Sequence, residues 1–400
     1  MNLDWDPEID TPATIAVIGG GPIGVETALY ARFLGYYVIL FEQAKIGQSL
    51  RNRGQSLMPF PIHEVVSSVG LAALQAQGAA IDFAASAEAM TYAQFSEKYL
   101  TPVAKTDLLY ESVHVNAKVL SISRVGVPLD SAVSSEERAE KEFRILVNSK
   151  ARGEFTQLAD IVLDCSGLGS QRQGMAAGGG ATIGQAHNES EVAIGKRDVL
   201  GRWRERYSGK HTVMLGSGWE AVANAMEFQK LAVSEPATQL TWIVPTRGNG
   251  SKIEFALPAD VEPSIQLAAE SFVASDSTNV IPMAALGVEA LSRTSPTSWK
   301  VQIQTQEDET IDVRCDEVIN CASPLVDWQF ATPIAAATQT LESFGTPIVR
   351  CEPHYYVLGQ KSLPANRLLT PAIGFAQIRH AFAIIGGRAD LNLFTSVKPL

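Results

Sequence analysis

Three glycines near the beginning of the sequence, Gly19, Gly21 and Gly24, stand at the spacing G-x-G-x-x-G. In a dinucleotide-binding turn the first glycine allows the tight bend, the second lets the backbone approach a pyrophosphate, and the third lets a helix pack closely on a strand. Glu42 follows at roughly the 20-residue distance at which an acid binds ribose hydroxyls. The expected site also includes the neighbours of these residues: Pro22, Ile23 and Gln43. The pattern predicts dinucleotide binding, and a purely structural glycine turn is the alternative.

Such glycines need a strand before them and a helix after them. Residues 15–18 form a short apolar run, typical of a buried parallel strand. Residues 25–34 then predict a helix, and residues 36–41 predict a second buried strand. The N-terminus of the helix would offer free N–H groups and the positive end of its dipole to phosphates. The strand, turn, helix, second strand and acid agree with one another, which an isolated glycine-rich turn would not show.

A second, similar pattern begins at His211 with a strand, a glycine turn and a helix. Its turn reads Gly216-x-Gly218-x-x-Ala221, and alanine is an accepted variant of the third glycine. No acid ends the following strand, where Thr246 and Arg247 stand instead. An arginine there can pair with a 2′-phosphate, which favours NADPH over NADH. An ordinary surface arginine is the alternative interpretation, and NADH remains possible.

The two patterns close in the same way. Residues 159–167 (ADIVLDCSG) and 315–323 (CDEVINCAS) are both apolar runs that end in a cysteine and small residues. Three strands are expected before the first closing run, over residues 112–124, 143–149 and 154–158. The chain therefore contains the same module twice, which predicts two dinucleotide sites. The glycine-rich segment between the modules, residues 174–184, reads as a hinge or linker, with phosphate binding as a less favoured alternative.

Composition excludes several classes of protein. A chain of 400 residues suggests two or three domains, and a net charge of −11 with no basic face argues against a nucleic-acid partner. No apolar run approaches the length of a membrane-spanning helix, and the acidic N-terminus does not read as a signal peptide. The four cysteines form no C-x-x-C pair, which argues against a zinc site and a redox disulfide. The histidines stand at unrelated spacings, which suggests no metal site. A reducing, cytoplasmic location is expected.

Across nearly its whole length from about Thr14 onward, the sequence resembles the flavoproteins with two dinucleotide-binding domains. This group holds the flavin monooxygenases and the pyridine-nucleotide–disulfide reductases. The resemblance implies an α/β fold of two Rossmann-like domains, with the NAD(P)-binding domain inserted in the FAD-binding domain. The expected division is 1–208 and 326–400 for the FAD domain and 209–325 for the NAD(P) domain.

The resemblance also implies roles for individual residues. The first glycine motif would hold the FAD pyrophosphate and Glu42 the adenosine ribose, while Val119 would offer backbone groups to adenine. Gly359 and Gln360 stand where many members have Gly-Asp beside the ribityl chain. Glutamine keeps the hydrogen-bonding capacity of aspartate but lacks its charge. The second motif would hold NADP, with NAD possible.

Two arginines, a histidine and a lysine are candidates for the chemistry around the flavin. Residues 51–63 follow the first motif and are expected to form the flavin-facing wall, where Arg53, or Arg51 near it, would hold an anionic substrate or steady a flavin peroxide. His63 would move a proton near neutral pH. Lys361 would stabilise an anionic reduced flavin. A structural ion pair for the arginines and a hydrogen-bonded residue at a helix start for His63 are the alternatives.

The family offers several activities. Disulfide reductases of this group need a cysteine pair over the flavin, and the sequence has none, nor does it have the F-x-G-x-x-x-H signature of the best-known flavin monooxygenases. The prediction is an FAD-dependent oxidoreductase that uses NADPH, as a monooxygenase acting on a small organic substrate through a flavin C4a-(hydro)peroxide. The alternatives are an NAD(P)H-dependent reductase or oxidase without oxygenated flavin, and a nucleotide-binding sensor without turnover. The sequence does not predict the oligomeric state.

Overall fold

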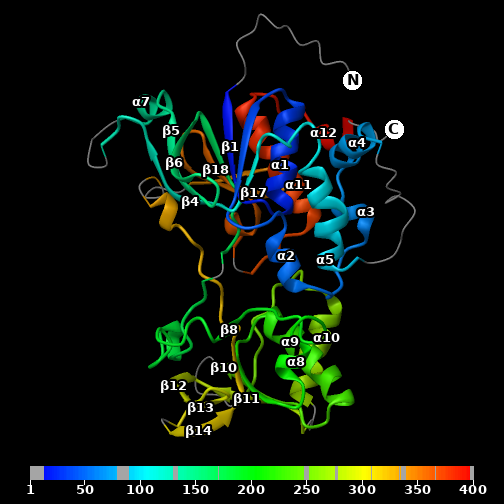
Figure 1. Ribbon diagram of the computed structural model, residues 1–400, viewed down its shortest axis with the longest axis vertical. Helices are drawn as coiled ribbons and strands as arrows, with labels where there is room; N and C mark the ends of the chain where they lie inside the picture. Colours follow the sequence, from blue (N-terminus) through cyan, green and yellow to red (C-terminus); the bar gives the residue numbers. More distant parts are fainter. Residues whose placement is uncertain are drawn as a thin grey trace, which may run out of the picture.

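The computed structural model describes residues 13–78, 90–128, 134–169, 171–246, 252–274, 278–307, 309–332, 334, 339–364 and 366–396. The described chain forms two bodies, one above the other in Figure 1. The first body contains the first and the last described strands of the chain, and the second body is formed by residues that lie between them in the sequence.

A seven-stranded sheet in the order β16-β17-β18-β7-β1-β2-β3 forms the centre of the first body. Neighbouring strands from β18 to β3 are parallel, as the apolar runs predict, and Val17 of β1 pairs with Leu40 of β2 and Leu163 of β7. The strands are β1 (Thr14–Ile18), β2 (Tyr37–Glu42), β3 (Val113–Val115), β7 (Ile161–Asp164), β16 (Gln339–Ser343), β17 (Thr346–Glu352) and β18 (Tyr355–Val357).

Different layers cover the two faces of this sheet. Ile15 and Val17 pack with helices in one core, whereas Ala16 and Ile18 pack with an antiparallel sheet in another, because successive strand residues face opposite sides. The antiparallel sheet is β4 (Ala117–Arg124), β5 (Phe143–Ser149) and β6 (Gly153–Ala159). The main helices on the other face are α1 (Pro22–Phe33), α4 (Ser68–Ala76) and α11 (Pro371–Ile385).

The second body repeats this plan. Its five-stranded parallel sheet has the order β11-β10-β9-β15-β8. Met214 packs with helices on one face, and Val213 and Leu215 pack with a three-stranded sheet on the other. The elements are β8 (Ala193–Ile194), β9 (His211–Leu215), α9 (Trp219–Ser234), β10 (Gln239–Pro245), α10 (Pro263–Ala274), β11 (Val280–Ala285), β12 (Gly287–Ser295), β13 (Ser298–Gln304), β14 (Thr310–Cys315) and β15 (Glu317–Asn320).

The backbone confirms that the same module occurs twice. Gly19 N–H donates to the Phe41 carbonyl at 2.8 Å, and Gly216 N–H donates to the Ile243 carbonyl at 3.0 Å. After the closing strands, Cys165 N–H donates to the Ile18 carbonyl at 2.8 Å, and Cys321 N–H donates to the Leu215 carbonyl at 2.7 Å. Each glycine turn is therefore held between its second strand and its closing strand in the same way.

Two features differ from the sequence-based expectations. The single strand expected over residues 112–124 divides at Asn116, which has a φ of 51°, so that β3 and β4 enter different sheets. Strand β8 pairs with β15, and Met175 and Val199 are buried in the cores of the second body. The second body thus includes residues well before position 209, because β8 forms an edge strand of its parallel sheet.

Two segments side by side connect the bodies. Gln173 N–H donates to the Ser323 carbonyl and Leu325 N–H donates to the Gln171 carbonyl, both at 3.0 Å. Arg172 and Pro324 form an antiparallel bridge between them. The glycine-rich segment that read as a linker follows this ribbon and packs on the second body, where Val288 N–H donates to the Met175 carbonyl at 2.8 Å.

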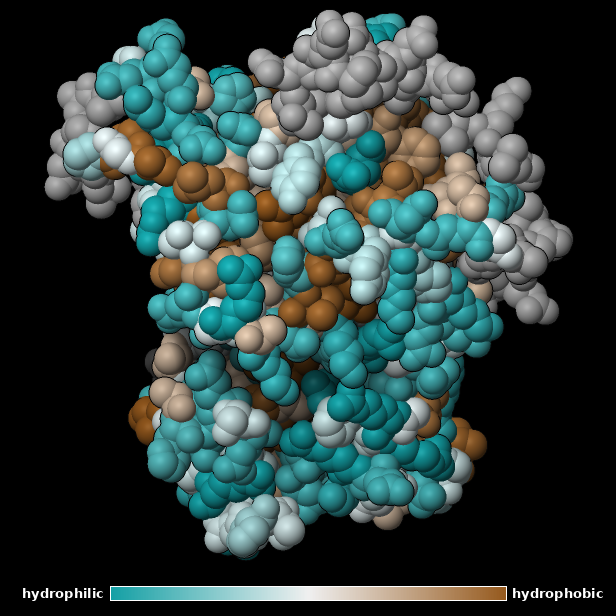
Figure 2. All heavy atoms as spheres, turned by 45° about the horizontal axis from the view of Figure 1, so that its top comes forward, coloured by the Kyte–Doolittle hydropathy of each residue, from teal (hydrophilic) through white to brown (hydrophobic). Residues whose placement is uncertain are grey.

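The remaining elements are short: α2 (Gln48–Arg53), α3 (Ile62–Val65), α5 (Tyr92–Phe95), η1 (Ser96–Leu100), α6 (Thr101–Val103), α7 (Ser135–Ala139), η2 (Ala177–Gly179), α8 (Arg204–Tyr207), η3 (Gln329–Ala331), η4 (Gly359–Ser362) and α12 (Leu393–Ser396). Within the described ranges, no helix combines the length and the apolar character needed to cross a bilayer. Figure 2 shows a mostly hydrophilic surface on the lower part of the molecule, and the hydrophobic residues on this face gather in the upper part.

Candidate functional site

Both glycine turns open into one cleft of about 1770 Å³ between the two bodies. Gly19 and Gly21 line it from the first body, and Gly216 and Gly218 line it from the second. Each turn follows the carboxyl end of a parallel strand at the point where the strand order reverses, which is where open α/β sheets bind ligands. A single small-molecule pocket has roughly 300–1,000 Å³, so this cleft has room for more than one ligand.

The glycines of the first turn divide into two kinds. A Cβ atom on Gly24 would lie 1.8 Å from the Gly19 carbonyl oxygen, and one on Gly19 (φ 105°) would lie 2.6 Å from the Cys165 oxygen. These two glycines allow the backbone itself to pack. A Cβ atom on Gly21 would meet no atom within 4 Å. The space beside Gly21 therefore belongs to the cleft, as the binding of a pyrophosphate requires.

The second turn has the same division. A Cβ atom on Gly216 would lie 2.4 Å from the Cys321 oxygen, whereas one on Gly218 would meet nothing within 4 Å. Ala221 is fully buried beneath the turn, where it packs in the core of the second body. The predicted residues of both glycine motifs thus fit a dinucleotide at each turn.

Glu42 lies beside the first turn and lines the cleft together with Pro22, Ile23 and Gln43. Its carboxylate accepts hydrogen bonds from Gly20 N–H and Ala44 N–H, both at 2.7 Å. These bonds connect the end of β2 to the glycine turn. Glu42 therefore stabilises the shape of the turn in addition to lining the cleft.

Gly359 and Gln360 line the cleft from the end of β18, where a Cβ atom on Gly359 would lie 3.8 Å from Ile23 at the start of α1. The Gln360 side chain is engaged within its own loop, accepting from Leu369 N–H at 2.7 Å and donating to the Arg367 carbonyl at 2.8 Å. The amide of Gln377 in α11 holds the Gly359 N–H at 2.7 Å. This loop therefore presents mainly backbone to the cleft.

Two of the residues named from the sequence, Val119 and His63, are not brought to the cleft. Val119 is buried in the core between the parallel and antiparallel sheets of the first body, and His63 is exposed at the start of α3. Neither belongs to the described residues that line the cleft. Arg247 lies outside the described residues, whereas its neighbour Thr246 lines the cleft.

Lys361 is buried in the first body instead of facing the cleft. Its ammonium group donates to Asp164 Oδ2 and to the Asp327 carbonyl, both at 2.7 Å, and lies 4.2 Å from the centre of the Trp328 ring. The side chains of Lys361 and Asp164 are fully buried. The structure therefore gives Lys361 an ion pair that joins η4 to the end of β7, and its burial removes it from contact with a ligand in the cleft.

Arg53 reaches the cleft from the end of α2. Its guanidinium lies 5.0 Å from the centre of the Tyr92 ring in the first body and 5.2 Å from that of Trp219 in the second glycine turn. Arg51 pairs with Glu97 at 2.8 Å, whereas Arg53 forms no ion pair with any described residue. Arg53 is thus a cation in the cleft that lies between Tyr92 of the first body and Trp219 at the second glycine turn.

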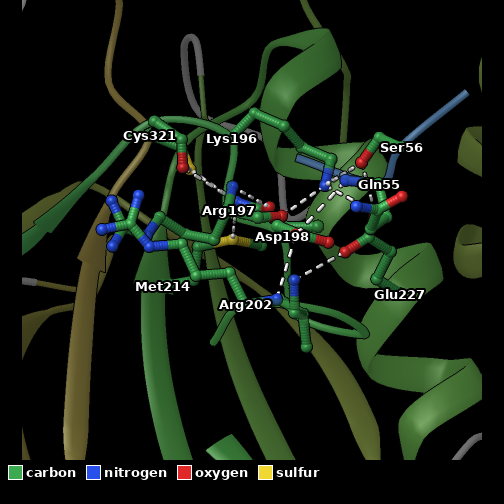
Figure 3. Close-up of polar contacts among 12 residues, drawn as sticks. Gln55, Ser56, Lys196, Arg197, Asp198, Arg202, Met214, Glu227 and Cys321 are labelled. Atoms are coloured by element: carbon green, nitrogen blue, oxygen red, sulfur yellow. Dashed lines mark hydrogen bonds and ion pairs between the residues drawn. The ribbon is translucent and has the colours of Figure 1, made fainter. Parts of the chain in front are cut away.

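A polar network that the sequence did not indicate joins the bodies beside the cleft (Figure 3). Ser56 of the first body donates to Glu227 Oε1 at 3.0 Å, and Lys196 pairs with the same oxygen at 2.6 Å. Gln55 N–H donates to Asp198 Oδ2 at 3.3 Å. These partners are far apart in the sequence, and no short motif could have revealed them.

Glu26 is an acid of α1 that also lines the cleft, although it is almost fully buried. Tyr99 O–H donates to its Oε1 at 2.5 Å and Ser67 O–H donates to its Oε2 at 2.6 Å. Burial raises the pKa of this carboxyl from 4.5 to about 7, against the effect of the two hydrogen bonds. Glu26 is therefore partly protonated near neutral pH.

All four cysteines are buried and unpaired: Cys165, Cys315, Cys321 and Cys351. Burial raises the pKa of each thiol to about 12. A thiolate is the reactive form of cysteine, so these thiols are poor nucleophiles at neutral pH. The described residues contain no group of three or more His, Cys, Asp and Glu side chains placed to hold a metal ion.

No family model matches the sequence, and no curated protein matches it either. Solved structures share its fold. A bacillithiol disulfide reductase from Bacillus cereus has a TM-score of 0.63 at 15% identity, over 94% of this chain and 99% of that one. The cadaverine monooxygenase of desferrioxamine biosynthesis from Erwinia amylovora, bound to FAD, has a TM-score of 0.63 at 14% identity, over 95% and 96%. An ornithine N-hydroxylase from Kutzneria sp. 744 has a TM-score of 0.61 at 13% identity, over 94% and 99%.

These similarities show the fold of the flavoproteins with two dinucleotide-binding domains, as the resemblance in the sequence implied. The neighbours are oxidoreductases that include both reductases and monooxygenases.

Proposed function

We propose that this protein is an FAD- and NADPH-dependent oxidoreductase, and specifically a monooxygenase acting on a small organic substrate. The observation that carries the proposal is that two dinucleotide-binding turns face one cleft, each with open space beside its middle glycine. Such an arrangement brings two dinucleotides together, as hydride transfer between them requires. We expect the enzyme to work in the cytoplasm, where its four free thiols would stay reduced.

In this proposal the first turn holds the FAD pyrophosphate, with Glu42 and the backbone of Gly359 at the edges of the same site. The second turn holds NADPH, and Arg247 pairs with its 2′-phosphate. Bound FAD would supply the redox chemistry, accepting a hydride and passing on its electrons. The protein contributes binding, orientation and the exclusion of water.

The thiols favour a monooxygenase or oxidase over a disulfide reductase. Reduction of a protein disulfide needs a reactive cysteine pair, and all four cysteines are buried with raised pKa values. Two of the structural neighbours are monooxygenases that act on small amines or amino acids by name. Arg53, a cation of the cleft beside the second turn, would bind an anionic group of the substrate. A reductase or oxidase of the same fold is the alternative.

A matched pair of substitutions tests the two sites separately. Gly21→Val should leave the protein folded but without FAD, because the branched side chain occupies the open space beside the turn. Gly218→Val should keep the FAD and lose most of its reduction by NADPH, for the same reason at the second turn. Flavin content by absorbance and anaerobic reduction by stopped flow measure both effects. Full flavin occupancy in Gly21→Val would reject the proposal.

The choice of activity and nucleotide needs two further measurements. Rapid mixing of the reduced protein with O2 should show a transient absorbance spectrum that belongs neither to reduced nor to oxidised flavin. Direct return to oxidised flavin with release of hydrogen peroxide would favour an oxidase.

NADPH should reduce the flavin faster than NADH, and Arg247→Ala should narrow the difference in rate between the two nucleotides by about 10- to 100-fold, from a lost contact of roughly 1.5–3 kcal/mol. Equal use of both nucleotides by the unmodified protein would reject the role of Arg247.

A further inference from the structure

An ion pair between Arg172 and Glu220 stands at the second glycine turn. Arg172 Nη1 lies 2.7 Å from Glu220 Oε2, and the two side chains are only 12% and 16% exposed. Both residues line the cleft. Glu220 is the second residue of α9, directly after Trp219 of the turn, whereas Arg172 comes from the ribbon that joins the two bodies.

The position of Glu220 has two opposite effects. A carboxylate in the first turn of a helix is stabilised by the helix dipole. The same helix end offers its N–H groups to a pyrophosphate, and a fixed negative charge beside it disfavours that anion. Glu220 alone would therefore weaken the binding of any dinucleotide at this turn.

Arg172 supplies the opposite charge and has donors to spare. A guanidinium carries five N–H donors. The Nη1 of Arg172 serves Glu220 and lies 3.4 Å from the Ala322 carbonyl, and its buried Nε has no hydrogen-bond partner among the described residues. The pair is neutral as a whole, so Arg172 cancels the charge of Glu220 at the turn.

We propose that Arg172 and Glu220 together set the affinity of the second turn for its dinucleotide. Arg172 strengthens the binding of the anionic pyrophosphate, and Glu220 weakens it, so that affinity depends on the balance of the pair. This inference rests on the proposed function, because it assumes that the second turn binds NADP(H). It assigns to both residues a role in binding that does not depend on the 2′-phosphate.

The test is the dissociation constant of NADP+ and of NAD+ for the FAD-loaded protein, measured by calorimetry without turnover. Arg172→Met should weaken the binding of both nucleotides by about tenfold or more, as the loss of a charge-assisted contact predicts. Glu220→Gln should tighten both by about threefold, and the double variant should bind both nucleotides with an affinity between those of the two single variants. Arg206 and Glu317 provide a matched control, since they pair at 2.5 Å in the same body away from the cleft-lining residues. Arg206→Met and Glu317→Gln should leave both constants unchanged.

The outcomes separate this inference from the proposed function. If NADP+ binds and neither Arg172→Met nor Glu220→Gln differs from the control variants, the inference is wrong and the second site stands. If neither nucleotide binds to the unmodified protein or to Glu220→Gln, the second site and the inference both fail. If circular dichroism shows that Arg172→Met does not fold, the tighter nucleotide binding expected for Glu220→Gln tests the inference alone.

Discussion

At the scale of single residues, Glu26 is the group whose charge state depends most clearly on the fold. The buried carboxyl accepts hydrogen bonds from Tyr99 and Ser67, yet burial raises its pKa from 4.5 to about 7. The unfolded chain releases this proton near its ordinary pKa, whereas the folded chain keeps it until the pH approaches 7. Between these values the folded state binds more protons, so stability falls as the pH rises.

We therefore predict that the free energy of unfolding decreases between pH 4.5 and pH 7 by of order 2–3 kcal/mol on account of Glu26. Glu26→Gln should remove this part of the pH dependence, because the amide does not titrate. Urea unfolding at pH 5 and pH 8 measures the difference in the free energy of unfolding between the two pH values. The control is Glu111→Gln, which changes an exposed acid. An unchanged difference between the two pH values in Glu26→Gln would contradict the assignment.

Residue roles could be predicted from the sequence where backbone geometry demands a residue type. Gly19, Gly24 and Glu42 are such positions. A side chain on either glycine would overlap the backbone, and the Glu42 carboxylate accepts hydrogen bonds from two backbone N–H groups. The role of Lys361 could not be predicted, because its partner Asp164 is distant in the sequence and only the assembled sheet buries both. The same limit applies to Arg172, whose place beside the second turn depends on the ribbon between the bodies.

At the scale of elements, the ion pair of Lys361 and Asp164 joins the short helix η4 to the end of strand β7. Asp164 also accepts from Ser166 O–H at 2.6 Å and from Tyr355 O–H at 3.2 Å. The pair thus holds together strand β18, the closing strand β7 and the loop of Gly359 and Gln360 that lines the cleft.

Lys361→Met should destabilise the protein by about 3–5 kcal/mol, because it leaves the carboxylate of Asp164 buried without its cation. Lys361→Met combined with Asp164→Asn should recover part of this loss. The control is Lys300→Met, which breaks an exposed pair with Asp312 and should cost under about 1 kcal/mol. Chemical denaturation measures all three. A stable Lys361→Met variant that has lost only its flavin reduction would return Lys361 to a catalytic role.

Elements with continuous apolar runs were predictable, whereas their breaks and pairings were not. The strands of both glycine motifs follow from residues such as Val17 and Ile243, buried in parallel sheets. The division at Asn116 depends on one backbone conformation that the sequence does not specify. Strand β8 is two residues long, too short to give a pattern, yet it completes the second sheet.

At the scale of the whole molecule, the two closing strands place Cys165 in the first body and Cys321 in the second, each beside a glycine turn. Burial raises the pKa of both thiols to about 12. Anaerobic titration should therefore deliver two electrons per FAD, with none to a thiol pair. Substitution of all four cysteines by serine should leave reduction by NADPH intact, although the buried sites will lose stability. Uptake of four electrons per FAD would overturn this expectation.

The ribbon between the bodies has a consequence for the modularity of the chain. The incoming and outgoing segments are hydrogen-bonded to each other at Gln173–Ser323 and Gln171–Leu325, so the second body begins and ends at one place. If the chain were cut at both segments, the second body could be removed as one piece with adjacent termini. A short loop could then connect the two cut ends of the first body. The parallel strands of the first sheet would stay complete, because none of them comes from the second body. Under the proposed function, the nucleotide specificity could then be exchanged as a unit, without rebuilding the proposed flavin site.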